Sequence, residues 1–135
     1  MLLMQLQTKE KFAFLELAHH LARIDDDFGE NEKEVILEYC AEMGIEDMLE
    51  YDSKTFILEE VLKDFKSKKS QKILLLELMI LVHADDRFDF KEHILIDTIA
   101  EFFVIDKQTL SHYSSWGKAV TALYMQGKLF LQDEG

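Results

Sequence analysis

Two short segments of the sequence gather carboxylates at a spacing that could bind a cation. Residues 25–32 read DDDFGENE, and residues 85–92 read DDRFDFKE. Carboxylate oxygens are the ligands that hard divalent cations prefer, so a site here would take Ca²⁺, Mg²⁺ or Mn²⁺. The candidate metal ligands are the acidic residues that recur in both segments: Asp25, Asp26, Glu32, Asp85, Asp86 and Glu92.

The same acidic residues also fit a corner between two helices that needs no ligand. Gly29 and Asp89 stand where a following helix would begin, and Glu32 and Glu92 come three residues later, where an acidic side chain caps a helix N-terminus. Capping does not account for the second aspartate of each segment. Both interpretations, a capped corner and a cation site, are open at the level of sequence, and so is the choice between one shared site and two.

A cation site in these segments would be weak, because neither segment follows the pattern of an EF-hand loop. Counting from Asp25, the sixth position is Glu30 instead of glycine and the twelfth is Ile36 instead of glutamate. We expect the first segment to bind more strongly than the second, where Arg87 and Lys91 supply counter-charge.

Histidines and serines offer a second kind of chemistry. His83 and His93 flank the second acidic segment and could extend it into the metal centre of a hydrolase. Two surface histidines are the simpler interpretation. Glu16 and His19 have the spacing of a di-iron helix, but the motif does not recur 60 residues later. The cluster Ser111, His112, Ser114 and Ser115 lacks a carboxylate that could orient a base, so the sequence predicts no nucleophile and no enzyme.

Length and composition predict one all-helical domain over residues 1–135. The chain has 135 residues, 48% of them hydrophobic, with no proline and five glycines. From the apolar spacing we expect about six helices, near 8–24, 30–44, 53–65, 71–84, 90–103 and from 107 onwards, where Gly117 could introduce a kink. Apolar stripes should place Phe12, Val35 and Tyr124 in the core. The fourth helix is apolar nearly all round, apart from Glu77, and should be central.

The net charge and the single cysteine indicate which partners and which cellular compartment to expect. The formal charge of −12 is opposite in sign to the basic surface of proteins that bind nucleic acid, and it also disfavours an anionic membrane. A basic protein surface would complement it. The longest apolar run, residues 73–82, is about half the length of a membrane span, so we expect no direct membrane insertion. The single cysteine, Cys40, fits a reducing cytoplasm and is expected to be buried.

An internal repeat emerges when the chain is shifted by 60 residues, without a gap. Leu21, Asp25, Asp26, Phe28, Glu32, Ile36 and Ile45 then meet Leu81, Asp85, Asp86, Phe88, Glu92, Ile96 and Ile105. The natural interpretation is a pair of three-helix units, about 8–65 and 71–127, related by a pseudo-twofold axis.

The repeated pattern, Asp-Asp-x-Phe-x-x-x-Glu after a helix that ends at Ile24 or Ala84, resembles the signature of the TerB-like family, the relatives of tellurite-resistance protein B. Each half in that family carries Ala-Asp-Gly-x-aliphatic-x-x-x-Glu. Both first aspartates and both glutamates match, whereas a second aspartate replaces the family glycine, phenylalanine replaces the aliphatic residue, and Ile24 replaces the first alanine. The resemblance covers roughly residues 8–127.

The resemblance implies a cytoplasmic, internally duplicated helical domain of a stress or metal-resistance system, with a suspected divalent-cation role and no established catalysis. Together with the charge, it predicts a non-enzymatic acidic module that binds a protein partner and a divalent cation. The alternative is a metal-dependent hydrolase that uses the same carboxylates with His83 or His93.

Overall fold

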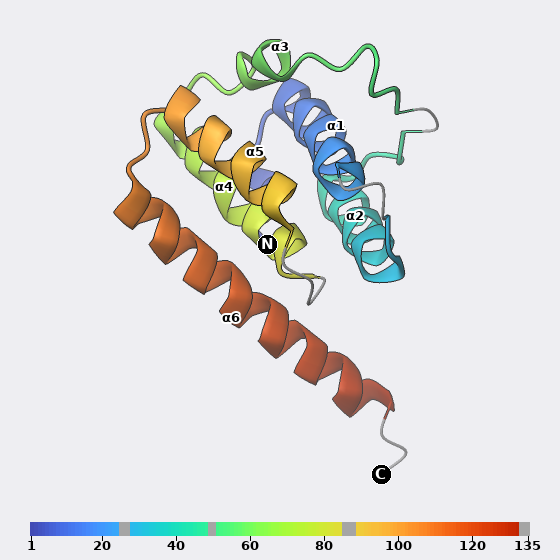
Figure 1. Ribbon diagram of the computed structural model, residues 1–135. Helices are drawn as coiled ribbons and strands as arrows, with labels where there is room; N and C mark the ends of the chain where they lie inside the picture. The colour runs from blue at the N-terminus through green and yellow to red at the C-terminus, as the bar shows by residue number, and fades with distance from the viewer. Residues whose placement is uncertain (25–27, 49–50, 85–88, 133–135) are drawn as a thin grey trace.

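The computed structural model describes residues 1–24, 28–48, 51–84 and 89–132, and within these ranges the chain is all-helical, as the sequence predicts (Figure 1). The described residues contain no strand. None of the described helices combines the length and the apolar character that a membrane span requires. The elements in chain order are the 3-10 helix η1 (Leu3–Gln5), α1 (Thr8–Arg23), α2 (Glu30–Met43), α3 (Leu58–Leu62), α4 (Lys68–Val82), α5 (Phe90–Phe102) and α6 (Lys107–Gln132).

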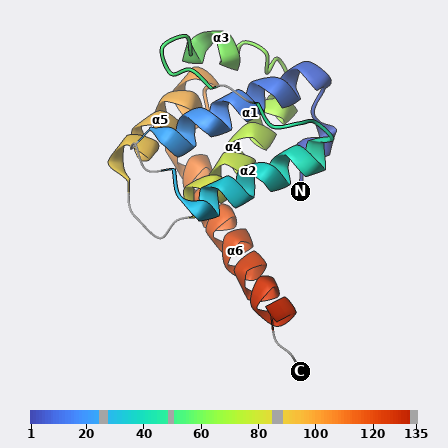
Figure 2. The same cartoon turned by 90° about the vertical axis from the view of Figure 1, so that its right-hand side faces the viewer.

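Helix α4 is the centre of the bundle, because it is apolar on nearly every side. It packs against α1, α2, α5, α6 and η1, and its most extensive contact is with α6. The largest fully buried side chains come mainly from α1 and α4: Phe14, Leu17, Leu21, Leu74, Leu75, Leu78 and Leu81. In both views the C-terminal end of α6 extends beyond the other helices (Figure 2).

Gly117 does not kink α6, contrary to the expectation from sequence. The helix runs unbroken from Lys107 to Gln132, and Gly117 lies buried against α4. A Cβ at this position would stand 2.6 Å from Cβ of Met79 and 2.8 Å from the Met79 carbonyl carbon. The glycine therefore serves close helix packing and not bending.

The ends of α2 and α5 are built alike. Gly44 follows α2 with φ of 69°, and Val104 follows α5 with φ of 59°. The next amide in each case bonds back to the helix, from Ile45 N to the Cys40 carbonyl at 3.1 Å and from Ile105 N to the Ala100 carbonyl at 2.8 Å. A left-handed residue followed by such a bond is the usual way to satisfy the last carbonyls of a helix.

The helix expected over residues 53–65 is wrong in extent, since α3 covers only Leu58–Leu62. Asp52 does not cap it. Its carboxylate accepts from the amide of Lys54 at 2.9 Å and its carbonyl accepts from the amide of Thr55 at 3.3 Å, so the segment closes a local turn. Aspartate side chains compete with helical hydrogen bonds in this way. Conversely, α4 begins three residues before the expected position, because Ser67 caps it through the amide of Ser70 at 3.0 Å.

Two predicted core residues lie at the surface. Phe12 is 53% exposed and Tyr124 is 49% exposed. The helical stripe of α1 turns Phe14 and Leu17 inward in place of Phe12, and the C-terminal half of α6 meets fewer neighbours than its sequence suggests. Val35 is partly buried against the core, and Cys40 is buried, as expected.

Candidate functional site

The described parts of both acidic segments act as helix caps. Glu32 and Glu92 are buried. The Glu32 carboxylate accepts from the amide of Gly29 at 3.1 Å, and the Asp89 carboxylate accepts from the amides of Lys91 and Glu92 at 2.7 and 3.3 Å. These bonds satisfy the amide of the α2 N-cap residue and two free amides in the first turn of α5.

The other predicted metal ligands, Asp25, Asp26, Asp85 and Asp86, lie outside the described residues. Within the residues that the structure describes, no three His, Cys, Asp or Glu side chains are grouped to hold a metal ion. The cation site at the corners therefore stays a prediction.

A groove of about 320 Å³ runs between α2 and α6 above the C-terminal part of α4; we call it the α2–α6 groove. Acidic and apolar side chains share its lining. The acids are Glu34, Glu38, Glu42 and Glu77, and the apolar residues include Val35, Ile80, Ala84, Val120 and Met125. Such a mixture suits a ligand that carries both positive charge and apolar surface.

The acidic rim of the groove has a simple origin in sequence. Glu34, Glu38 and Glu42 are four residues apart, so they share one side of α2, where like charges at this spacing repel. Cations and hydrogen-bond donors of α6 relieve part of that repulsion. Lys128 Nζ lies 2.6 Å from Glu34 Oε1 and 3.7 Å from Glu38 Oε1. A hydrogen bond to Glu38 raises the pKa of Tyr124 to about 12.

Glu77 is the buried acid in the lining of the groove. Its side chain is 0% exposed, and its Oε1 accepts from the amide of Leu2 at 2.7 Å and lies 3.2 Å from the amino group of Met1. Its Oε2 has no hydrogen-bond partner among the described residues. Burial raises the pKa of Glu77. Nearby, Glu42 Oε2 accepts from the amide of Leu3 at 2.7 Å, and its Oε1 pairs with the Met1 amino group.

Sequence reasoning missed this groove, although two signals for it are present. One is the run of glutamates at a spacing of four in α2, and the other is the single acid in the apolar segment 73–82. Neither signal tells which helix lies opposite α2. The groove forms only because α6 lies there, so it could not be predicted from these glutamates alone.

His19 joins α1 to the segment after α2 through hydrogen bonds of its ring. Its Nε2 lies 2.6 Å from Asp47 Oδ1, while its Nδ1 pairs with Nη1 of Arg23. Because the guanidinium can only donate, Nδ1 must carry the lone pair and Nε2 the proton, which is donated to Asp47. Burial lowers the pKa of His19. The arrangement holds a neutral imidazole between two charged partners, which is a structural role.

Asp47 also faces the lone cysteine. Burial, reinforced by the negative charge of Asp47, raises the pKa of the Cys40 thiol to about 11. A thiol with so high a pKa is almost wholly protonated at neutral pH, so Cys40 is a poor nucleophile.

His83 pairs with a serine and not with the acidic corner. Its Nε2 lies 3.0 Å from Oγ of Ser114 on α6, and burial lowers the pKa of the ring. No sequence pattern predicts this pair, because His83 ends α4 and Ser114 lies on α6, 31 residues later. Among the described residues, the hydrogen-bond partner of the His83 ring is Ser114 and not a carboxylate. His93 is exposed and lines a neighbouring hollow of about 340 Å³ with Asp97.

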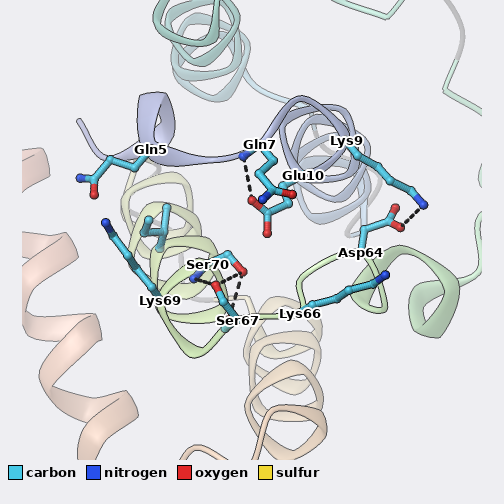
Figure 3. Close-up of a pocket in the computed structure, with 10 residues that line it drawn as sticks. Gln5, Gln7, Lys9, Glu10, Asp64, Lys66, Ser67, Lys69 and Ser70 are labelled. Carbon is cyan, nitrogen blue, oxygen red and sulfur yellow. Dashed lines mark hydrogen bonds and ion pairs between the residues drawn. The ribbon is translucent and has the colours of Figure 1, made fainter.

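A further pocket of about 290 Å³ lies where the N-terminal ends of α1 and α4 meet (Figure 3). Helix N-termini attract anions, and Lys9, Lys66 and Lys69 add positive charge. The structure already supplies the acceptors, however. Glu10 accepts from the amide of Gln7 at 2.8 Å, and Lys9 pairs with Asp64 at 3.2 Å. Ser67 caps α4 in a similar way. The helix N-termini at this pocket therefore already have acceptors within the fold.

No family model matches this chain, and no curated protein or solved structure matches it either. The TerB-like resemblance therefore rests on the residues and spacing of the two acidic segments.

Proposed function

We propose that this protein is a non-enzymatic interaction module that binds a basic, amphipathic segment of a protein partner in the α2–α6 groove. The observation that carries the proposal is the lining of the groove, where four carboxylates border an apolar floor. Complementary charge steers and selects a partner, and the apolar floor supplies surface to bury.

The chain itself illustrates the chemistry that the groove accepts. Between Lys107 and Gln132, α6 contains three lysines and no Asp or Glu, in a protein whose formal charge is −12. Lys128 reaches from this helix to Glu34 and Glu38. Helix α6 is thus a basic, partly apolar segment, and its Lys128 already contacts the acidic side of α2.

We also propose that the chain is a duplicated, TerB-like domain of a stress or metal-resistance system in the cytoplasm. Three correspondences at an offset of 60 residues support the duplication. Helices α2 and α5 begin at positions 30 and 90, the N-caps of α1 and α4 are Gln7 and Ser67, and the left-handed residues are Gly44 and Val104. The stress-response context is carried by the sequence resemblance alone.

Binding of a defined basic peptide tests the proposed interaction. The probe is a short, end-blocked, dye-labelled helical peptide with lysine and leucine at amphipathic spacing, and its reference is the same peptide with glutamate in place of lysine. We expect saturable binding of the lysine peptide by fluorescence anisotropy, weakened by sodium chloride, and no binding of the glutamate peptide.

A matched pair of variants locates that binding. The double variant Glu34→Gln/Glu38→Gln removes two charges from the groove, and Glu59→Gln/Glu60→Gln removes two from exposed positions of α3. The first should weaken binding and the second should leave it nearly unchanged. Equal effects of the two, or binding of both peptides alike, would contradict the proposal.

A further inference from the structure

Glu77 is a buried carboxylate whose surroundings leave part of it without a partner. Its neighbours along α4, Leu74, Leu75, Leu78 and Leu81, are all 0% exposed. A buried carboxylate is costly unless both oxygens are bonded. Oε1 has the amide of Leu2 and the amino group of Met1, whereas Oε2 has no hydrogen-bond partner in the described part of the chain. Since Glu77 lines the α2–α6 groove, the missing donor can come from a ligand in that groove.

We propose that the part of the α2–α6 groove lined by Glu77 and Glu42 is a recognition site for the ammonium group of a lysine of the partner, with these two carboxylates as its acceptors. This inference rests on the proposed function. It adds the residue of the partner that is recognised and the side chains of this protein that bind it.

The charges of the groove leave room for such an ammonium group. Four carboxylates line it, from Glu34, Glu38, Glu42 and Glu77, against two cations, Lys128 and the amino group of Met1, so two negative charges remain. Both cations present are ammonium groups, which shows the kind of donor that these carboxylates accept. Met1 is 67% exposed, so an entering lysine reaches Glu77 by displacing the exposed end of the N-terminal segment.

The hydrogen bonds of Glu77 favour lysine over arginine. An arginine binds a carboxylate best through two parallel bonds to both oxygens. Oε1 of Glu77 is already an acceptor for the amide of Leu2, and only Oε2 is without a bond. A lysine needs only that one oxygen and can give its other protons to Glu42. Its aliphatic stem would lie along Val35 and Ile80.

The test compares the lysine peptide described above with an otherwise identical arginine peptide, on the parent protein and on Glu77→Gln. The control is Glu101→Gln, which removes an exposed charge from α5. We expect the parent to prefer the lysine peptide, and Glu77→Gln to lose about tenfold or more in affinity for it, since a charge-assisted hydrogen bond is lost. The preference for lysine over arginine should disappear in Glu77→Gln and persist in Glu101→Gln.

Circular dichroism checks whether Glu77→Gln is folded. If it is not, Glu42→Gln takes its place, because Glu42 is only half-buried and receives the same ammonium group. Binding of the lysine peptide that is weakened by Glu34→Gln/Glu38→Gln but not by Glu77→Gln or Glu42→Gln would overturn this inference and leave the proposed function standing. A parent protein that binds neither peptide would overturn both.

Discussion

Gly44 and Val104 occupy the same backbone conformation 60 positions apart, each just after a helix and each with positive φ. For glycine this conformation is free of strain, whereas a β-branched residue pays about 1–2 kcal/mol in steric clash. Val104 is also 85% exposed, so its side chain contributes little packing.

Replacing Val104 by glycine should therefore stabilise the protein. The relief of strain outweighs the extra chain entropy of glycine, and we expect the free energy of unfolding to rise by up to about 1 kcal/mol. Urea denaturation measures it. Val104→Ala keeps a Cβ and should gain less, while Gly44→Val should destabilise by about 1–2 kcal/mol. A loss of stability in Val104→Gly would show that the valine side chain holds a contact that matters more than its strain.

Two glycines of α6 should respond in opposite directions to alanine. A Cβ at Gly117 would meet Met79 at 2.6 Å, so Gly117→Ala must push α6 away from α4 and cost about 1–3 kcal/mol. A Cβ at Gly127 meets nothing within 4 Å, so Gly127→Ala should gain up to about 1 kcal/mol through helix propensity. Thermal denaturation of the two variants compares them directly. The same sign for both would contradict the close approach of α6 to α4.

One buried histidine, His19, and two half-buried ones, His20 and His83, should make stability depend on pH. The folded-state pKa of His19 is lowered by burial, and burial also lowers those of His20 and His83. The unfolded chain then binds more protons than the folded one, so the stabilisation is complete above the unfolded pKa of about 6.5 and is lost as pH falls toward the folded values.

His19→Asn separates the contribution of one histidine. The variant should be less stable than the parent at pH 7.5, by about 1–3 kcal/mol, since Asp47 and Arg23 lose their shared partner. The difference between parent and variant should shrink as pH falls below about 6.5, because only the parent has this imidazole to protonate. Denaturation curves across this range measure both quantities. A difference that is constant with pH would refute the neutral, doubly bonded His19.

Cys40 should resist alkylation while the protein is folded. Its pKa rises from 9.0 to about 11, which lowers the thiolate fraction about 100-fold before burial of the sulfur is considered. Reaction with iodoacetamide at pH 8, followed by mass spectrometry, should be at least that much slower in buffer than in concentrated urea. Similar rates in both would mean that the segment around Cys40 opens readily in the native protein.

The helices that the sequence predicted well are those whose signals are local. Helix α2 is bounded by an acidic first turn and by Gly44, and α4 is recognised by its length of apolar sequence. Helix α3 was predicted too long because Asp52 is a typical N-cap residue, whereas its side chain closes a local turn with the amide of Lys54. Local polar competition of this kind is not visible in hydrophobic spacing.

The candidate groove could not be predicted, since it depends on contacts between residues far apart in the chain. The glutamates of α2 were visible in the sequence, but their relation to Lys128 depends on how α6 crosses α4. That crossing is fixed by Gly117 against Met79, where the sequence suggested a kink. The partners of His19 and His83 were hidden for the same reason, as Asp47 and Ser114 are 28 and 31 residues away.

The position of α4 also bears on how the chain folds as it is synthesised. This helix is apolar on almost all sides, and its most extensive packing partner, α6, is the last helix of the described chain. Until α6 has left the ribosome, the side of α4 around Met79 has no cover. The nascent chain therefore exposes one apolar side of α4 until α6 follows, and chaperones bind apolar surface of this kind.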